Sequence, residues 1–182
     1  FTAAGVWGFN ERYLIGPDLL GLPLEEWLFF LVAPYACVFI HEVLRHFVPR
    51  DVLGVAGRPI ALLLALLFLS VGLVTHERAY TATTLLGTAL FLAYHALFLR
   101  SRWLGRFFLS YGVCLIPFLL VNGVLTGTFL PEPIVWYKDA ENLGIRILTI
   151  PIEDSVYLML LLLIVITFHE RDRERRAISS QA

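Results

Sequence analysis

Charged residues are scarce in this chain of 182 residues. Asp, Glu, Lys and Arg together make up 16% of it, whereas hydrophobic residues make up 58%. Soluble domains contain roughly 25% charged and 45–50% apolar residues, so the composition disfavours a soluble globular domain. The formal net charge is −1, and the broad basic surface that a nucleic-acid partner requires is missing. We therefore expect no nucleic-acid partner.

Cysteine is also rare. The two cysteines, Cys37 and Cys114, both fall inside long apolar runs, and no spacing supports a disulfide, a zinc site or a thiol nucleophile. We interpret both as small apolar residues. No grouping of His, Cys, Asp and Glu in the sequence predicts a metal site, so we expect none.

Alternation of apolar and polar residues, which is typical of membrane strands, is absent, and this argues against a β-barrel. The chain instead has long runs without a charged residue, at 27–40, 59–75, 79–99, 107–130 and 155–168. A membrane span needs about 20 mostly apolar residues, and a helix satisfies its own backbone hydrogen bonds in lipid. We predict an all-α, polytopic transmembrane helical bundle with about five spans.

Basic residues divide unevenly between the two sides of the predicted spans. Ten lie on one side: Arg45, Arg50, Arg58, Arg100, Arg102, Arg106, Arg171, Arg173, Arg175 and Arg176. Four lie on the other: Arg12, Arg78, Lys138 and Arg146. The positive-inside rule places the first side in the cytoplasm. We therefore expect an integral protein of the cell inner or plasma membrane with a cytoplasmic C-terminus.

Acidic residues are skewed in the opposite direction. Ten of the fifteen lie on the outer side: Glu11, Asp18, Glu25, Glu26, Glu77, Glu132, Asp139, Glu141, Glu153 and Asp154. Acidic residues contribute little to orientation, so this skew indicates a function on that side.

An internal repeat is visible in the sequence. Residues 6–26 read VWGFNERYLIGPDLLGLPLEE and residues 135–154 read VWYKDAENLGIRILTIPIED, at an offset of 128 or 129 residues. The offset exceeds the period of a solenoid and indicates duplication of a small helical unit. The spans that begin at Pro23 and Pro151 are the first and fifth, so they run in the same direction and the repeats are parallel.

The repeat also predicts how the chain is organised. We expect 1–48 to be the C-terminal part of the first repeat, 49–78 a linking span, 79–170 the second repeat and 171–182 a cytoplasmic tail. Two three-span units joined by one linking span would give seven spans. We therefore expect two further spans, missing or partial, before residue 9.

Two pairs of acidic residues open spans of the repeat: Glu25 and Glu26 after Pro23, and Glu153 and Asp154 after Pro151. Proline followed by acidic residues is also an ordinary way to begin a helix. However, the uncharged runs that follow are 14 residues each, or about 21 Å against a hydrocarbon core of about 30 Å. Acids held at the edge of lipid are costly and usually functional.

These acids suit the protonation of an apolar substrate. Desolvation and a like-charged neighbour both favour a protonated carboxyl group, whereas the helix dipole favours the ionised form. Aromatic side chains near the acids could stabilise a cation, and the candidates are Trp27, Phe30, Tyr157, Trp7 and Trp136. The alternative is that the tryptophans form an interfacial aromatic belt.

The two motifs Pro23-Leu-Glu-Glu-Trp-Leu-Phe-Phe and Pro151-Ile-Glu-Asp, each opening a membrane helix of a duplicated unit, resemble the membrane-type lycopene cyclases. These occur as paired three-span subunits or as their fusion. Further similarity lies in Gly5-Val-Trp-Gly-Phe-Asn-Glu-Arg-Tyr, Val121-Asn-Gly-Val-Leu-Thr-Gly and Glu141-Asn-Leu-Gly-Ile-Arg-Ile. The similarity covers nearly the whole chain.

The resemblance implies an enzyme of the intramolecular lyase or isomerase type in carotenoid biosynthesis. It would cyclise the ψ-ends of lycopene, or of a longer carotenoid, into ionone rings by acid protonation, without redox chemistry. The chain has no Gly-x-Gly-x-x-Gly turn, so we expect no flavin or other cofactor. Carried onto this sequence, the resemblance makes Glu25, Glu26, Glu153 and Asp154 the candidates for proton donor and acceptor, with Glu25 and Glu153 foremost.

Other interpretations remain open at this point. A proton-coupled carrier or a non-catalytic subunit of a carotenoid complex, with lipid and a possible homo-oligomer as partners, would also fit membrane acids in parallel repeats. His41 and Glu42 could relay protons, but we expect them to snorkel to the interface. His95 and Asn122 are predicted to form hydrogen bonds between helices, or else to contact substrate. The sequence does not distinguish β, γ or ε rings, or one cyclised end from two.

Overall fold

The computed structural model describes residues 1–179 and is 70% helical. Within these residues, five helices are long and apolar enough to cross a membrane. They are α1 (Leu24–Phe47), α2 (Gly54–Val74), α3 (Ala79–Ala93) with its π-helical continuation η3 (Tyr94–Leu99), α4 (Leu104–Leu125) and α5 (Ile152–Ser179). The predicted all-α bundle with about five spans is confirmed. Residues 171–179 of the predicted tail continue α5, and 180–182 lie outside the described residues.

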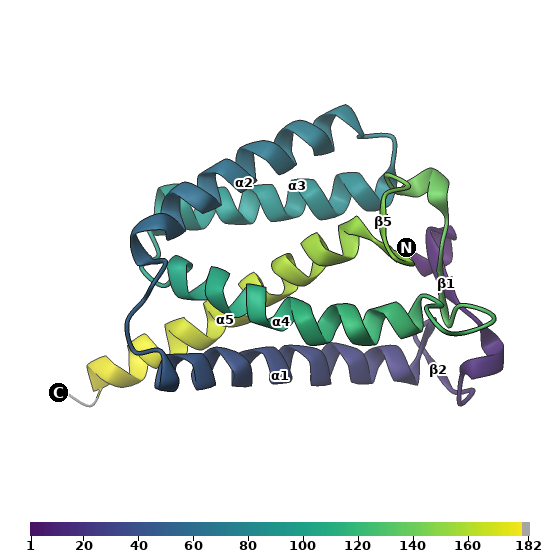
Figure 1. Ribbon diagram of the computed structural model, residues 1–182, viewed down its shortest axis with the longest axis horizontal. Helices are drawn as coiled ribbons and strands as arrows, with labels where there is room; N and C mark the ends of the chain where they lie inside the picture. The colour runs from purple at the N-terminus through teal and green to yellow at the C-terminus, as the bar shows by residue number, and fades with distance from the viewer. Residues whose placement is uncertain (180–182) are drawn as a thin grey trace.

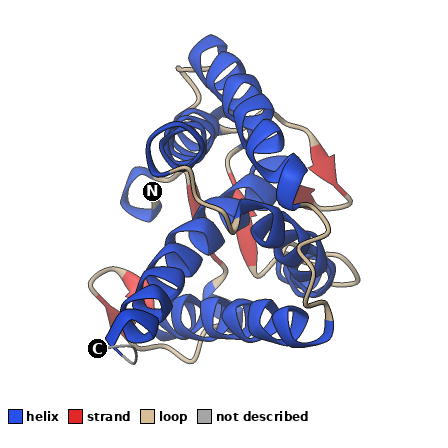
Figure 2. Ribbon diagram, turned by 90° about the vertical axis from the view of Figure 1, so that its left-hand side faces the viewer, coloured by secondary structure: helices blue, strands red, loops and turns tan. Residues whose placement is uncertain are grey.

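The helices form a bundle in which α5 contacts α1, α3 and α4, while the short strands and the N-terminus gather at one end (Figure 1). Figure 2 views the bundle along its long axis, from the opposite end. Leu158, Leu162, Leu163 and Ile166 of α5 are each at most 1% exposed. By contrast, α1 and α2 expose many large apolar side chains, such as Leu31 at 69% and Leu63 at 68%. This pattern is expected for a bundle whose outer surface contacts lipid, because apolar side chains face lipid at no cost.

The segments before α1 and before α5 contain the same elements in the same order. The first has β1 (Trp7–Phe9), the short helix η2 (Glu11–Tyr13), and the hairpin of β2 (Asp18–Leu19) and β3 (Leu22–Pro23). The second has β4 (Val135–Tyr137), η4 (Asp139–Glu141), and the hairpin of β5 (Arg146–Ile147) and β6 (Ile150–Pro151). A further short helix, η1 (Thr2–Ala4), precedes β1. The order of elements thus follows the sequence repeat.

Strands β1 and β4 connect these two segments directly. They pair antiparallel, with Trp7 opposite Tyr137, Gly8 opposite Trp136 and Phe9 opposite Val135. A side chain at Gly8 would overlap the Trp136 ring, since a Cβ there would lie 2.5 Å from a ring carbon. The glycine therefore allows the two strands of the repeat to meet.

The two hairpins also enter their helices in the same way. Leu20 and Leu148 take positive φ angles of 56° and 58° at the turn. The first N–H of α1, from Leu24, donates to the Pro17 carbonyl at 3.2 Å, and that of α5, from Ile152, donates to the Ile145 carbonyl at 3.0 Å. Each pair of acids therefore follows a hairpin of the same shape, and both pairs lie at the same end of the bundle (Figure 1).

Candidate active site

Glu25 and Glu153, the first acid of each pair, hold the loops that precede their helices. Oε1 of Glu25 accepts the backbone N–H of Ile15 at 2.6 Å, and Oε1 of Glu153 accepts that of Leu143 at 2.7 Å. Glu153 is 1% exposed and also accepts the Thr81 hydroxyl at 2.6 Å. In both residues the second oxygen, Oε2, is buried without a hydrogen-bond partner among the described residues.

Asp154, the second acid of the second pair, is surrounded by hydrogen-bond donors. The Tyr80 hydroxyl donates to Oδ1 at 2.5 Å, while Oδ2 accepts Nδ2 of Asn122 at 2.6 Å and the Tyr137 hydroxyl at 2.9 Å. These donors come from α3, α4 and β4, so three elements converge on one carboxyl group. Asp154 is 2% exposed. The three donors offset part of the cost that burial imposes on an ionised carboxylate.

Tyr137 lies outside the spans, at the end of β4. Burial, followed by the nearby charge of Asp154, raises the pKa of its phenol well above the usual range. The hydroxyl therefore keeps its proton at neutral pH and remains a donor to Asp154. Its ring also lies 5.7 Å from that of Tyr80, so the two phenols form one wall.

Glu26, the second acid of the first pair, lies in the same cavity as Asp154. The cavity is about 250 Å³ and is lined mainly by aromatic side chains. No hydrogen bond to the Glu26 side chain is found within residues 1–179. Glu26 and Asp154 thus share a cavity but differ in setting: one carboxyl group faces apolar surfaces and the other is fully hydrogen-bonded.

The cavity contains only some of the aromatic residues predicted for cation stabilisation. Trp7, Phe30 and Tyr157 line it. Trp27 does not, and its indole N–H donates to the Leu19 carbonyl at 3.0 Å, which fixes the hairpin. Trp136 is 42% exposed and packs over Gly8. The structure therefore brings together Glu26, Asp154 and three of the five aromatics.

An apolar groove of about 380 Å³ adjoins the acidic cavity. Four residues line both: Phe29, Phe118, Asn122 and Leu125. The groove follows α1 from Glu25 to Ile40, which is about 22 Å at 1.5 Å per residue, with α4 as its other wall. Cys37 and Cys114, which are buried free thiols, lie in this wall as small apolar residues.

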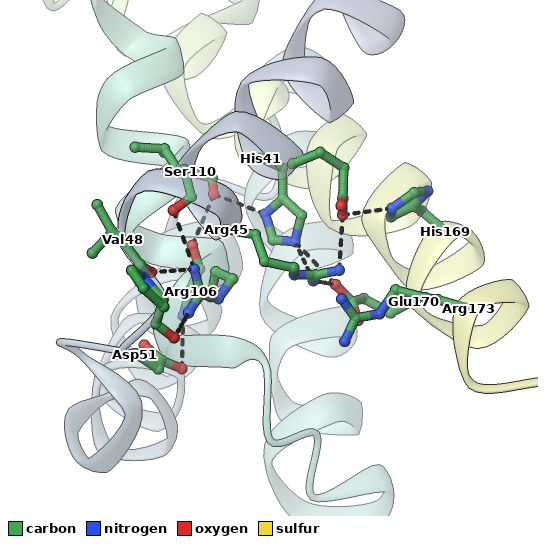
Figure 3. Close-up of polar contacts among 12 residues, drawn as sticks. His41, Arg45, Val48, Asp51, Arg106, Ser110, His169, Glu170 and Arg173 are labelled. Atoms are coloured by element: carbon green, nitrogen blue, oxygen red, sulfur yellow. Dashed lines mark hydrogen bonds and ion pairs between the residues drawn. The ribbon is translucent and has the colours of Figure 1, made fainter. Parts of the chain in front are cut away.

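A second polar cluster lies at the opposite end of the spans and joins three helices (Figure 3). His41 on α1 is fully buried, with Nδ1 2.8 Å from the Ser110 hydroxyl on α4 and Nε2 3.0 Å from Oε1 of Glu170 on α5. The prediction that His41 snorkels to the interface is therefore wrong, because neighbouring helices supply its partners. Glu42 does reach the more exposed side and pairs with His169 at 2.8 Å.

Ligand atoms of His41, Glu42 and Glu170 lie within 4.8 Å of one another, a spacing that a metal ion could bridge. Arg45, however, extends among all three. It lies 2.8 Å from Glu42 and 3.1 Å from His41, and it forms an ion pair with Glu170. The guanidinium supplies the positive charge of this cluster, so we interpret the cluster as a clamp between α1 and α5.

Sequence reasoning found the acids and Asn122, but not the two tyrosines that also donate to Asp154. The predicted hydrogen bonds between helices are present. Asn122 donates to Asp154, and the His95 ring lies 3.0 Å from the Thr167 hydroxyl. Tyr80 and Tyr137 were not predicted. Tyr137 directly follows Trp136 in the repeated motif and could have been noticed, whereas nothing in the sequence around Tyr80 marks it.

Comparison with known families gives one match. A family model described as Lycopene cyclase matches residues 1–44 and 77–171, which include both acid pairs and all three donors to Asp154. Further comparisons with curated proteins and with solved structures give no match. Five helices able to span a membrane make the chain an integral membrane protein, and the family supports a carotenoid cyclase function. Because the match covers most of its length, the chain belongs to the lycopene cyclase family.

Proposed function

We propose that this protein closes the ψ-ends of lycopene, or of a longer carotenoid, into ionone rings by proton transfer, without flavin or net redox change. The observation that carries the proposal is a single aromatic cavity with two carboxyl groups in unlike settings, Glu26 and Asp154, and an apolar groove that adjoins it. The two settings suit a proton donor and a proton acceptor.

Glu26 is the proposed proton donor. Its carboxyl group faces aromatic surface and has no hydrogen-bond donor among the described residues, so its neutral form is the favoured one. The proton adds to the terminal double bond of the ψ-end, and the electrons of that bond form the new C–H bond. The tertiary cation that remains is attacked by the internal double bond, which closes the six-membered ring and moves the cation into it.

Asp154 is the proposed acceptor. Its negative charge, held by Tyr80, Tyr137 and Asn122, stabilises the cation across the cavity. Loss of a proton from a carbon next to the ring cation forms the ring double bond. The proton added at the start is thus returned, the product is an isomer of the substrate, and one proton transfer between the carboxyl groups resets the site.

Glu25 and Glu153 have a different proposed role. In each residue, one carboxyl oxygen accepts a hydrogen bond from the backbone N–H ten residues earlier. These bonds hold the hairpins that shape the cavity. The aromatic rings of Trp7, Phe30 and Tyr157 provide faces for the cation, each worth about 0.5–2 kcal/mol. The polyene chain occupies the groove between α1 and α4, where only one end of the substrate reaches the acids at a time.

We also propose the organisation inferred from the sequence: a first repeat at 1–48, a linking span at 49–78 and a second repeat at 79–170. The family match leaves out 45–76, which contains α2, and this supports a linking role for that helix. We further propose that the acids face the outer side of the membrane and the C-terminus the cytoplasm.

The decisive experiment is expression in a host that accumulates lycopene, followed by chromatography of the pigments. Ring formation shifts absorption and retention time, whereas a carrier or scaffold would leave lycopene unchanged. Glu26→Gln and Asp154→Asn should each lower cyclisation by at least about a hundredfold, since general acid–base groups contribute 10²–10⁴-fold. Glu77→Gln, an exposed acid at the same end, is the matched control. Full activity in both site variants would remove the assignment.

A further inference from the structure

A third hollow, of about 280 Å³, is lined by residues of η3, of the loop between η3 and α4, and of the C-terminal half of α5. These segments lie at the end of the bundle opposite the short strands (Figure 1). Arg100 and Arg102, from the loop between η3 and α4, line it together with Arg171 from α5. Its acidic lining residue is Glu174. The charged side chains that line the hollow therefore carry a net charge of about +2.

These three guanidinium groups have no acidic partner within residues 1–179. Other arginines of α5 do: Arg173 pairs with Glu170 and Arg176 with Asp172. Unpaired arginines that share a hollow repel one another, which is unfavourable unless an anion joins them. The guanidinium fork is suited to bidentate contacts with phosphate oxygens.

The base of the hollow is held together by hydrogen bonds. His95, which is fully buried, lies 2.8 Å from the Ser101 hydroxyl through Nδ1 and 3.0 Å from the Thr167 hydroxyl through Nε2. Because Ser101 belongs to the loop and Thr167 to α5, the imidazole ties the two arginine-bearing segments together. The ring of Trp103 packs 5.0 Å from that of His95 and completes the wall.

The surroundings favour a phosphate that belongs to a lipid. The helical turns just before the arginines expose large apolar side chains, with Phe98 at 77%, Leu97 at 48% and Phe168 at 68%. The hollow thus lies where exposed apolar surface gives way to a basic loop, as at the boundary between acyl chains and headgroups. Basic pockets between spans at this level bind anionic headgroups in membrane proteins.

We propose that this hollow binds the phosphate group of an anionic phospholipid, with Arg100, Arg102 and Arg171 as its ligands. The site is independent of the acidic cavity and of the cyclase chemistry. It anchors the loop between η3 and α4 to the C-terminal half of α5 when lipid is bound.

The test is native mass spectrometry of the full chain in detergent, titrated separately with phosphatidylglycerol and phosphatidylcholine of equal chain length. Phosphatidylglycerol should bind more tightly than phosphatidylcholine. Each arginine replaced by glutamine should weaken binding about fivefold, since one basic residue near the surface contributes about 1 kcal/mol. The triple variant R100Q/R102Q/R171Q should therefore bind phosphatidylglycerol about a hundredfold more weakly.

The matched control is R50Q/R58Q/R175Q, which removes the same charge from exposed positions at the same end of the spans. This control should bind phosphatidylglycerol as the unaltered protein does. An equal loss in both triple variants would overturn the proposal, because it would reflect only the general positive field. Displacement of the lipid by inorganic phosphate at equal concentration would also overturn it in favour of a soluble phosphate ligand. Should the triple variant not fold, Arg100→Gln alone must show the fivefold loss.

Discussion

Glu25 and Glu153 occupy equivalent positions, and each accepts the backbone N–H of the residue ten positions earlier, from Ile15 at 2.6 Å and from Leu143 at 2.7 Å. The residue that follows each of them, Glu26 or Asp154, faces the shared aromatic cavity. We propose that the duplicated motif separates two tasks. Its first acid holds the loop, and its second acid faces the cavity in which the protons are transferred.

This division predicts different outcomes for the two kinds of acid. Glu153→Ala should lower the free energy of unfolding by about 2–4 kcal/mol, because it leaves the half-buried amide of Leu143 and the buried hydroxyl of Thr81 without their acceptor. Glu25→Ala should cost less, since its hydrogen bond lies in an exposed region. Denaturation in detergent measures both, with Glu77→Ala as control. Glu25→Ala should retain ring formation; complete loss of cyclisation with normal stability would show that Glu25 acts in the chemistry.

Tyr137→Phe removes one of the three donors to Asp154 without changing the shape of the wall. A hydrogen bond to a charged group contributes about 1.5–3 kcal/mol, so cyclisation should fall by about ten- to a hundredfold. The fall should be nearer tenfold if the hydrogen bonds from Tyr80 and Asn122 are enough to hold Asp154 in place. The conversion rate of lycopene at fixed protein abundance measures the effect. Tyr35→Phe, at a phenol that is 75% exposed on α1, should leave the rate unchanged.

Tyr137 also predicts a pH dependence of stability. Its pKa in the folded protein is raised by burial and by Asp154, whereas in the unfolded chain it is about 10. Above that pH the unfolded chain releases a proton that the folded protein keeps, so stability falls as pH rises. The contribution is fully present below about pH 10 and is lost above it. Unfolding measured between pH 8 and 11 should show this decline, and Tyr137→Phe should make it shallower.

Much of this arrangement follows from sequence patterns alone. Long uncharged runs determine the five spans, and the repeated motif determines that both acid pairs open helices at one end. The sequence could not tell which acid of each pair faces the cavity. Adjacent helical residues point about 100° apart, and only the packing of α3, α4 and β4 against α5 selects Asp154.

The partners of His41 could not be predicted from the sequence either, because they depend on how the helices pack. His41 reads as a residue that snorkels to the interface, because the sequence gives no sign that Ser110 and Glu170, 69 and 129 positions away, lie beside it. Trp27 and Trp136 were predicted to belong to the site because they lie close in sequence to residues that do line it, Glu26 and Tyr137. Their rings instead fix a hairpin and cover Gly8.

The groove between α1 and α4 predicts a size limit for the polyene. Ala33→Phe places a ring in a wall that now has only a methyl group, so the substrate should bind at least about tenfold more weakly, with KM affected more than kcat. Leu31→Phe adds a ring to the same helix at a position that is 69% exposed and outside the groove, and is the control. Equal effects of the two substitutions would show that the polyene does not lie in this groove.

Gly57 and Gly105 set the distance between α2 and α4. A Cβ at Gly105 would lie 2.4 Å from the carbonyl carbon of Leu53, and one at Gly57 would lie 2.4 Å from the backbone nitrogen of Gly105. Since these contacts are with backbone, the helices must move apart to accept a methyl group, and overpacking of this kind costs about 1–3 kcal/mol. Gly112, on α4 as well, has no atom within 4 Å of such a Cβ.

Gly57→Ala and Gly105→Ala should therefore each lower the unfolding temperature in detergent, whereas Gly112→Ala should leave it unchanged or raise it slightly, because alanine favours the helix by up to about 1 kcal/mol. The proposed linking helix α2 meets α4 at this crossing, far from the acids, so cyclisation per folded molecule should stay the same in all three variants. A loss of stability at Gly112 equal to that at Gly105 would mean that the close approach of α2 to α4 is not what these glycines permit.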